Sequence, residues 1–208
     1  MTLPGSKSIA LRHLVMSSLA PSQTTIHGVP KCDDIDAMTQ ALTMLGVVIK
    51  EINTSTFLVN PPTNLGDSNI HLNLELSGVS LRLLLAVAAL RPTTTHFDGL
   101  EPLRARPNQD MIEALEELGC DTTSTDGGRL PMSITGTRNY SLEVSVGTSI
   151  SSQYLSGLLL VAPLFPNGLP VKMKGAVVSA PYVDITRTEM SKRGITVETV
   201  DDRTLHVK

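Results

Sequence analysis

The residues best suited to chemistry lie at the start of the chain. A Pro-Gly turn leads into Ser6, Lys7 and Ser8, and Arg12 follows Ser8 by one helical turn. Unpaired N–H groups and the helix dipole favour an anion at such a helix start. A hydroxyl, an ammonium and a guanidinium would then meet one phosphate or carboxylate. The alternative is a capping serine with two solvated cations, and this segment alone does not separate the two.

Polar side chains also precede two long apolar segments further along. Ser151, Ser152 and Gln153 stand before Leu155–Leu164, and a Ser-Gly-Val-Ser sequence that ends in Arg82 stands at the matching place in the middle of the chain. Capping explains one serine. Buried polar side chains need hydrogen-bond partners. A polyhydroxylated ligand would supply such partners to the side chains that capping does not explain.

Two further sets precede other helices. Arg104 and Arg106 come before one predicted helix, and Ser179 and Tyr182 begin another. Taken alone, residues of these types in such places are more often surface or capping residues than ligand contacts.

A threefold repeat must position these residues. Helix-terminating glycines recur at Gly46, Gly119 and Gly194, and strand-terminating glycines precede them at Gly28, Gly99 and Gly175, by 18, 20 and 19 residues. A glycine after a helix is favoured because it adopts positive φ without strain. We therefore expect three units of about residues 1–68, 69–138 and 139–208, together forming a single domain.

Within each unit the pattern predicts strand, helix, strand, helix, strand, strand. The first helix is apolar on nearly all sides and so buried, whereas the second is amphipathic. The opening strands are expected at 70–76 and 140–146, and unit one lacks one before its first helix, which we interpret as a cut at a domain boundary. The predicted strand pairs are 47–52 with 56–59, 121–125 with 130–135, and 196–200 with 204–207. The predicted fold class is α/β (α+β), with three βαβαββ repeats, buried helices and outward-facing sheets.

Composition narrows the class of partner. Net charge is −3, the aromatic fraction is 3% and there is no tryptophan, so neither a basic surface nor stacking platforms for nucleic acid are expected. The apolar runs are shorter than the roughly 20 residues that span a bilayer. The two cysteines form no CxxC pair, which favours a reduced cytoplasmic setting. The five histidines show no metal-ligand spacing, and no cofactor or metal is expected.

Taken together, the motifs resemble the EPSP synthase (3-phosphoshikimate 1-carboxyvinyltransferase) family, in the order and spacing of its N-terminal domain. The resemblance depends on the opening Pro-Gly-Ser-Lys-Ser with Arg12, on Arg106-Pro107, on Ser151–Tyr154 and on Ser179–Thr186. The sister enzymes that act on UDP-N-acetylglucosamine resemble the chain less, because they carry Asn where this chain has Ser8 and usually a cysteine before their Arg-Pro.

The resemblance implies that this half holds shikimate 3-phosphate and part of the phosphoenolpyruvate site. The residues implied to bind shikimate 3-phosphate are Lys7, Ser8, Arg12, Ser151, Ser152, Gln153, Ser179 and Tyr182. Those implied to hold phosphoenolpyruvate are Lys7, Gly78, Arg106 and Gln153, with Lys7 as the catalytic residue. The acid and base of the reaction would come from a C-terminal domain, the expected partner of this chain.

One segment departs from the family. Glu75–Val79 stands where the family normally has Gly-Asn-Ala-Gly-Thr, so Leu76 and Val79 replace an amide and a hydroxyl, and Leu83 replaces a proline. This favours an alternative hypothesis, a non-catalytic anion-binding module of the same fold. A purely structural repeat is disfavoured by the polar helix starts.

Overall fold

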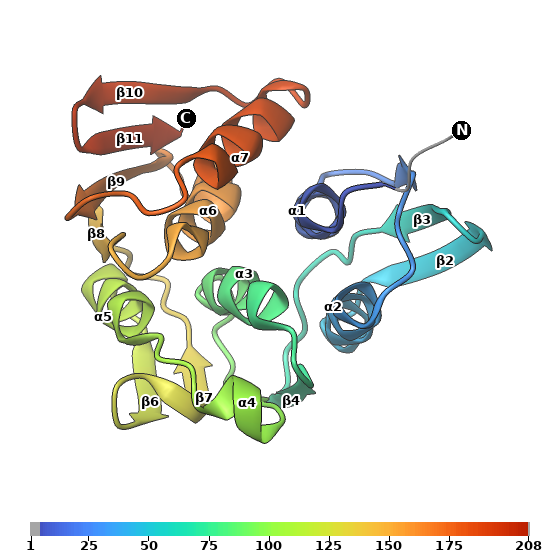
Figure 1. Ribbon diagram of the computed structural model, residues 1–208, viewed down its shortest axis with the longest axis horizontal. Helices are drawn as coiled ribbons and strands as arrows, with labels where there is room; N and C mark the ends of the chain where they lie inside the picture. The colour runs from blue at the N-terminus through green and yellow to red at the C-terminus, as the bar shows by residue number, and fades with distance from the viewer. Residues whose placement is uncertain (1–4, 208) are drawn as a thin grey trace.

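The computed structural model describes residues 5–207, and its elements fall into three consecutive groups (Figure 1). The first group contains α1 (Lys7–Ser18), β1 (Thr24–His27), α2 (Asp33–Met44), β2 (Val48–Asn53) and β3 (Thr56–Asn60). The second contains β4 (Ile70–Asn73), α3 (Gly78–Ala88), β5 (Thr95–Asp98), α4 (Glu101–Arg104), α5 (Gln109–Leu118), β6 (Asp121–Thr125) and β7 (Arg129–Thr135). The third contains β8 (Val144–Gly147), α6 (Ser152–Val161), the 3₁₀ turn η1 (Ala162–Leu164), β9 (Leu169–Lys174), α7 (Pro181–Ser191), β10 (Val197–Asp201) and β11 (Thr204–Val207).

Each group forms its own sheet, and the second and third sheets have the same topology. Their strand orders are β4-β5-β7-β6 and β8-β9-β11-β10, with the opening strand parallel to its neighbour and the other pairs antiparallel. The first sheet has the order β1-β3-β2. Among residues 5–207, no strand lies on the other side of β1, where the parallel opening strand lies in the other two units. The expected βαβαββ repeat is confirmed, with unit one lacking its opening strand in the described part.

The helices lie inside and the sheets outside, as the sequence predicts. Figure 1 shows α1, α3 and α6 at the centre, with the three sheets arranged around them. Helix α3 is buried along almost its whole length. Eight of its side chains are apolar, and the helix has no continuous polar face that could be exposed to solvent. A single hydrophobic cluster draws on all three units, from Leu11 through Leu84 to Leu158. No helix in the described part is both long and apolar enough to cross a membrane.

Glycine determines how closely two of the central helices approach. A Cβ placed on Gly157 of α6 would lie 3.0 Å from the carbonyl oxygen of Arg82 and 3.2 Å from Cβ of Ala86, both on α3. The absent side chain therefore lets the two backbones pack directly. At the helix ends, Gly46, Gly119 and Gly194 all have positive φ, as predicted from their repeat position.

Three local predictions need correction. The opening strands are shorter than expected: β4 ends at Asn73, and β8 begins only at Val144, because the chain bends at Leu142, where the Ser141 hydroxyl donates to the Glu143 carbonyl. The short helix α4 was not predicted. It begins with a Glu-Pro pair suited to a helix start, but its four residues are too few to show periodicity.

Candidate functional site

The polar residues singled out in the sequence lie at the starts of α1, α3, α6 and α7. At each junction between two units, side chains from one helix start contact the next. A cavity of about 810 Å³ lies elsewhere, at the C-terminal ends of the first helices, lined by residues such as Leu19, Leu90 and Leu164. No predicted site residue lines that cavity.

The junction between units one and two is centred on Asp34, at the start of α2. Lys7 Nζ lies 2.7 Å from Asp34 Oδ2, and the Ser77 hydroxyl donates to Asp34 Oδ1 at 2.5 Å. Burial alone would raise the pKa of Asp34, but the hydrogen bonds from Lys7 and Ser77 outweigh it and lower that pKa. The hydrogen bond to Asp34 likewise raises the pKa of Lys7. Both groups are therefore charged at neutral pH.

Gly78 and Arg106, which the resemblance assigns to the same ligand, lie together at the start of α3. A Cβ on Gly78 would be 2.6 Å from Arg106 Nη1, so the guanidinium rests directly against the helix backbone. The segment Glu75–Val79, which differs from the family pattern, forms this helix start. Leu76 is half exposed at 50%, and Glu75 adopts a left-handed φ of 51°. A non-glycine residue in that conformation is strained, and here Asn73 stabilises it by accepting from the Glu75 N–H at 3.0 Å.

The junction between units two and three is built on Arg82 of α3. Its Nη1 donates to Gln153 Oε1 at 3.0 Å and to Ser151 Oγ at 3.3 Å, and its Nε donates to Asn108 Oδ1 at 3.3 Å. Ser151 also caps α6, because its hydroxyl accepts from the Gln153 N–H. The guanidinium carbon lies 5.2 Å from the Tyr154 ring centroid, a cation–π distance. Arg82 thus orients two of the predicted ligand groups.

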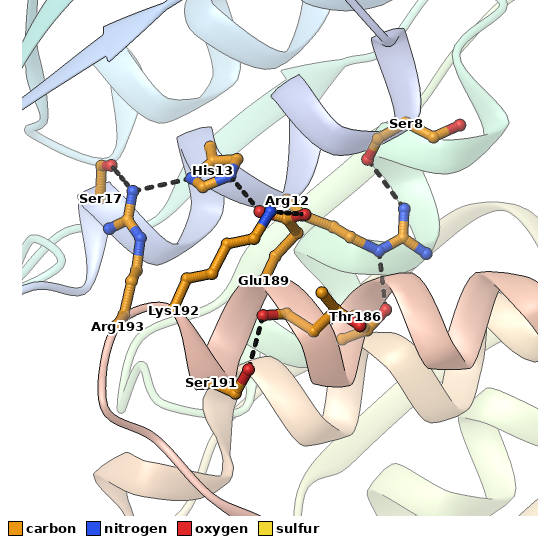
Figure 2. Close-up of polar contacts among 10 residues, drawn as sticks. Ser8, Arg12, His13, Ser17, Thr186, Glu189, Ser191, Lys192 and Arg193 are labelled. Atoms are coloured by element: carbon orange, nitrogen blue, oxygen red, sulfur yellow. Dashed lines mark hydrogen bonds and ion pairs between the residues drawn. The ribbon is translucent and has the colours of Figure 1, made fainter.

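The junction between units three and one is built on Arg12 of α1, which is only 1% exposed (Figure 2). It donates to Thr186 Oγ1 at 2.7 Å, to the Ser8 carbonyl at 2.8 Å, to the Tyr182 carbonyl at 3.2 Å and to Ser156 Oγ at 3.3 Å. A guanidinium has five N–H donors, so these bonds use four of them, and the fifth, on Nη1, makes no hydrogen bond described in residues 5–207. Of the two alternatives that the sequence left open here, a solvated cation is wrong for Arg12, because its side chain is buried and ties α1 to α6 and α7.

The predicted residues differ in how closely the structure connects them. Arg106 lies against Gly78, Ser151 is bonded to Gln153, and Arg12 is bonded to the carbonyls of Ser8 and Tyr182. The described contact of Lys7 is with Asp34, which was not predicted. Ser152 is buried, and Ser179 is exposed with a left-handed φ of 55°, and no hydrogen bond described here joins either side chain to the others. Tyr182 is 43% exposed at the start of α7.

Sequence reasoning missed three members of this arrangement: Asp34, Arg82 and Asn108. Asp34 lies in the first turn of α2, where an acidic residue is usual at a helix start, so its residue type and place alone give no sign of a site. Arg82 was noted only as part of a motif. Asn108 is fully buried, and its contacts with Arg82 and with the Gly128 carbonyl depend on the folded chain.

The fold places the chain among proteins with the enolpyruvyl transferase architecture. Over its whole length the chain superposes on EPSP synthase from Acinetobacter baumannii, with a TM-score of 0.82 at 22% identity, covering 46% of that chain. It also superposes on the enolpyruvyl transferase NikO from Streptomyces tendae, with a TM-score of 0.63 at 15% identity, covering 98% of this chain and 47% of the other. At such identities the likeness shows the fold alone.

The chain belongs to the EPSP synthase (3-phosphoshikimate 1-carboxyvinyltransferase) family, whose model matches residues 1–208. Among curated relatives, the 3-phosphoshikimate 1-carboxyvinyltransferase of Shewanella halifaxensis is 33% identical over 213 residues, covering 100% of this chain and 50% of the relative. That of Photobacterium profundum is 36% identical over 207 residues, covering 97% and 48%. The chain therefore spans about half the length of the relatives it matches.

Proposed function

We propose that the chain is one half of an enolpyruvyl transferase, which moves the enolpyruvyl group of phosphoenolpyruvate to the 5-hydroxyl of shikimate 3-phosphate. Residues 1–208 would form one domain, in three units of about 1–68, 69–138 and 139–208. A C-terminal domain of the same enzyme would be its partner. The observation that carries the proposal is the set of polar helix starts from all three units, joined by Asp34, Arg82 and Arg12.

In this proposal the chain's own residues bind and orient two anions. Lys7, Ser8 and Arg12 of α1, with Ser151, Ser152 and Gln153 of α6 and Ser179 and Tyr182 at α7, hold shikimate 3-phosphate. Arg106 and the backbone of Gly78, with Lys7 and Gln153, hold phosphoenolpyruvate. Arginine suits this role because its planar fork makes bidentate bonds to carboxylate or phosphate.

The reaction also needs proton transfers: the 5-hydroxyl loses a proton as the methylene carbon of phosphoenolpyruvate gains one and becomes a methyl group. That methyl group then loses a proton as phosphate leaves, which re-forms the carbon–carbon double bond. Asp34 is poorly suited to this task, since its ion pair with Lys7 and its lowered pKa leave it without a proton to give as an acid and make it a weak base. We propose that the partner domain supplies the acid and base, while Lys7 stabilises negative charge on the substrates.

A second candidate, a non-catalytic anion-binding module, is favoured by one observation. The exposed side chain of Leu76 stands beside the Arg106 subsite, where the family normally has an amide. Binding of shikimate 3-phosphate without any transfer activity in the completed enzyme would support this candidate.

Calorimetry with shikimate 3-phosphate tests the leading proposal. Lys7 is a better probe than Arg12, because its side chain is 47% exposed and its removal leaves the core intact. Loss of one charged hydrogen bond costs about 1.5–3 kcal/mol, so Lys7→Met should weaken binding about tenfold or more. Lys50→Met is the matched control, since Lys50 is exposed on β2 and its side chain makes no hydrogen bond or ion pair with a site residue within residues 5–207. No binding by the unaltered chain, or equal affinities for both variants, would refute the proposal.

A further inference from the structure

A second polar cluster joins α1 to α7 outside the predicted site (Figure 2). Arg193 Nη2 lies 2.9 Å from His13 Nδ1, and His13 Nε2 lies 2.9 Å from Glu189 Oε2. Lys192 donates to the other Glu189 oxygen at 2.8 Å, and Arg193 also donates to the Ser17 hydroxyl at 3.1 Å. We call His13, Glu189 and Arg193 the α1–α7 clasp.

The hydrogen-bond directions in the clasp follow from chemistry. Arginine can only donate, so His13 Nδ1 must accept, and His13 Nε2 then carries the proton and donates to the Glu189 carboxylate. His13 is therefore a neutral imidazole between a cation and an anion. Protonating it would direct a second N–H at Arg193, which breaks one contact and places two positive charges side by side.

The clasp continues the row of contacts that holds Arg12. Tyr182, Thr186, Glu189 and Arg193 follow one another along α7 and its C-terminal turn at helical spacing, so they share the face that meets α1. Arg12 and His13 are adjacent on α1. Arg12 bonds to the N-terminal half of that face, and His13 bonds to its C-terminal half. The position of the Arg12 guanidinium thus depends on how α7 is seated against α1.

We propose that His13, Glu189 and Arg193 are positioning residues of the anion site: they seat α7 against α1 and thereby place Arg12 and Tyr182. The inference rests on the proposed function for its ligand, but the placement of Arg12 can be measured without any ligand. The clasp residues themselves touch no substrate group in this assignment.

The charges around His13 give the clasp a definite pH dependence. Burial has the largest effect on His13 and lowers its pKa. The positive charges of Arg193 and Lys192 lower this pKa further, whereas Glu189 raises it. Burial alone would raise the pKa of Glu189, but hydrogen bonds from Lys192 and His13 outweigh it. Arg12 and Ser17 are the polar neighbours on α1, and His27 of β1 lines the same cavity of about 320 Å³ as His13 and Arg193.

The stability of the clasp therefore falls as the pH falls. A histidine whose pKa is lowered by folding stabilises the folded state above its unfolded pKa of about 6.5, and this stability is lost as pH falls through the folded value. Glu189 acts in the same sense at lower pH. The clasp is therefore intact at neutral pH and opens in acid.

Two His13 variants separate positioning from bulk. His13→Gln can accept from Arg193 through its amide oxygen and donate to Glu189 through its amide nitrogen, without titrating. His13→Leu retains volume but neither contact. We expect His13→Gln to keep the affinity of the unaltered chain at pH 7.5, and His13→Leu and Glu189→Gln to lose about tenfold.

The pH dependence of the affinity for shikimate 3-phosphate tests whether His13 acts through its protonation state. Between pH 8 and 5, the affinity for shikimate 3-phosphate should fall more steeply in the unaltered chain than in His13→Gln. Titration of the ligand phosphate affects both chains equally, so the comparison removes its effect. His27→Gln is the matched control for the neighbouring histidine and should keep the steep profile. Identical profiles for the unaltered chain and His13→Gln would overturn the proposal.

A ligand-free measurement distinguishes this proposal from the proposed function. The Nε proton of Arg12, bonded to Thr186, should exchange with water about tenfold faster in His13→Leu than in the unaltered chain or in His13→Gln, as followed by NMR of ¹⁵N-labelled arginine. Unchanged exchange in all variants would refute the positioning role even if shikimate 3-phosphate binds. Faster exchange without any binding would support the clasp and refute the ligand assignment.

Discussion

Lys7 and Arg12 show how the same charge on one helix serves two tasks. Lys7 is nearly half exposed and paired with Asp34, whereas Arg12 is buried and makes four hydrogen bonds to the protein. Their spacing in the sequence predicts that both are near a helix start. It does not reveal which one is buried, because Thr186, the Nε partner of Arg12, lies 174 positions away.

The Tyr154 hydroxyl is a residue-scale contact whose contribution can be measured directly. Tyr154 is fully buried, and its hydroxyl donates to the Pro107 carbonyl at 2.9 Å, next to Arg106. Tyr154→Phe leaves that carbonyl without this partner, so we expect a loss of about 1–2 kcal/mol in the free energy of unfolding, measured in urea. Tyr140→Phe is the control, because the Tyr140 hydroxyl makes no hydrogen bond described in residues 5–207 and should cost less than about 0.5 kcal/mol. Equal losses would contradict the assignment.

At the scale of elements, local signals predicted most of the fold. Glycine positions and hydrophobic periodicity located the repeat, the buried first helices and the strand pairs, because each of these depends on residues close together in sequence. The start of β8 and the helix α4 were wrong or missed, because short segments carry too few periods. The inter-unit contacts of Arg82 and Asn108 could not be predicted, since they depend on how α3, α5 and α6 pack.

The close approach of α3 and α6 gives a prediction at this scale. Gly157→Leu would drive a side chain into the Arg82 carbonyl and Ala86, so the two helices must separate. Overpacking of this kind typically costs about 1–3 kcal/mol, and we expect the urea midpoint to fall accordingly. Thr188→Leu adds a leucine to the exposed side of α7 and should change stability little. A Gly157→Leu chain as stable as the Thr188→Leu chain would show that the helix contact is looser than described.

At the scale of the whole molecule, the three units meet in a ring, and each junction carries one buried or half-buried polar group. Asp34 joins units one and two, Arg82 joins two and three, and Arg12 joins three and one. Because each group also contacts a predicted ligand residue, the packing of the three units and the arrangement of these residues depend on the same contacts. The edge of β1, with no partner strand among the described residues, interrupts the symmetry of this ring.

The whole-molecule proposal predicts that this chain alone gives no measurable transfer from phosphoenolpyruvate to shikimate 3-phosphate. In this proposal its helix starts bind both anions, but the acids near them in the described part are poorly suited to proton transfer: Asp34 is paired with Lys7 and has a lowered pKa, and Asp184 is exposed on α7. General acid–base catalysis contributes about 10²–10⁴-fold, and an incomplete cleft also loses much of the positioning effect. Phosphate release measured with both substrates should therefore stay at background.

Adding the other half of a relative, such as the Photobacterium profundum protein, should restore part of the activity. The same mixture made with Lys7→Met should fall back toward background, whereas Lys50→Met should match the unaltered chain. This pair of variants shows whether turnover passes through the site on this chain or arises from the added half alone. Turnover by the isolated chain at the rate of an ordinary enzyme would refute the half-enzyme proposal, because it would require an acid and a base within residues 1–208 that are not among the groups described.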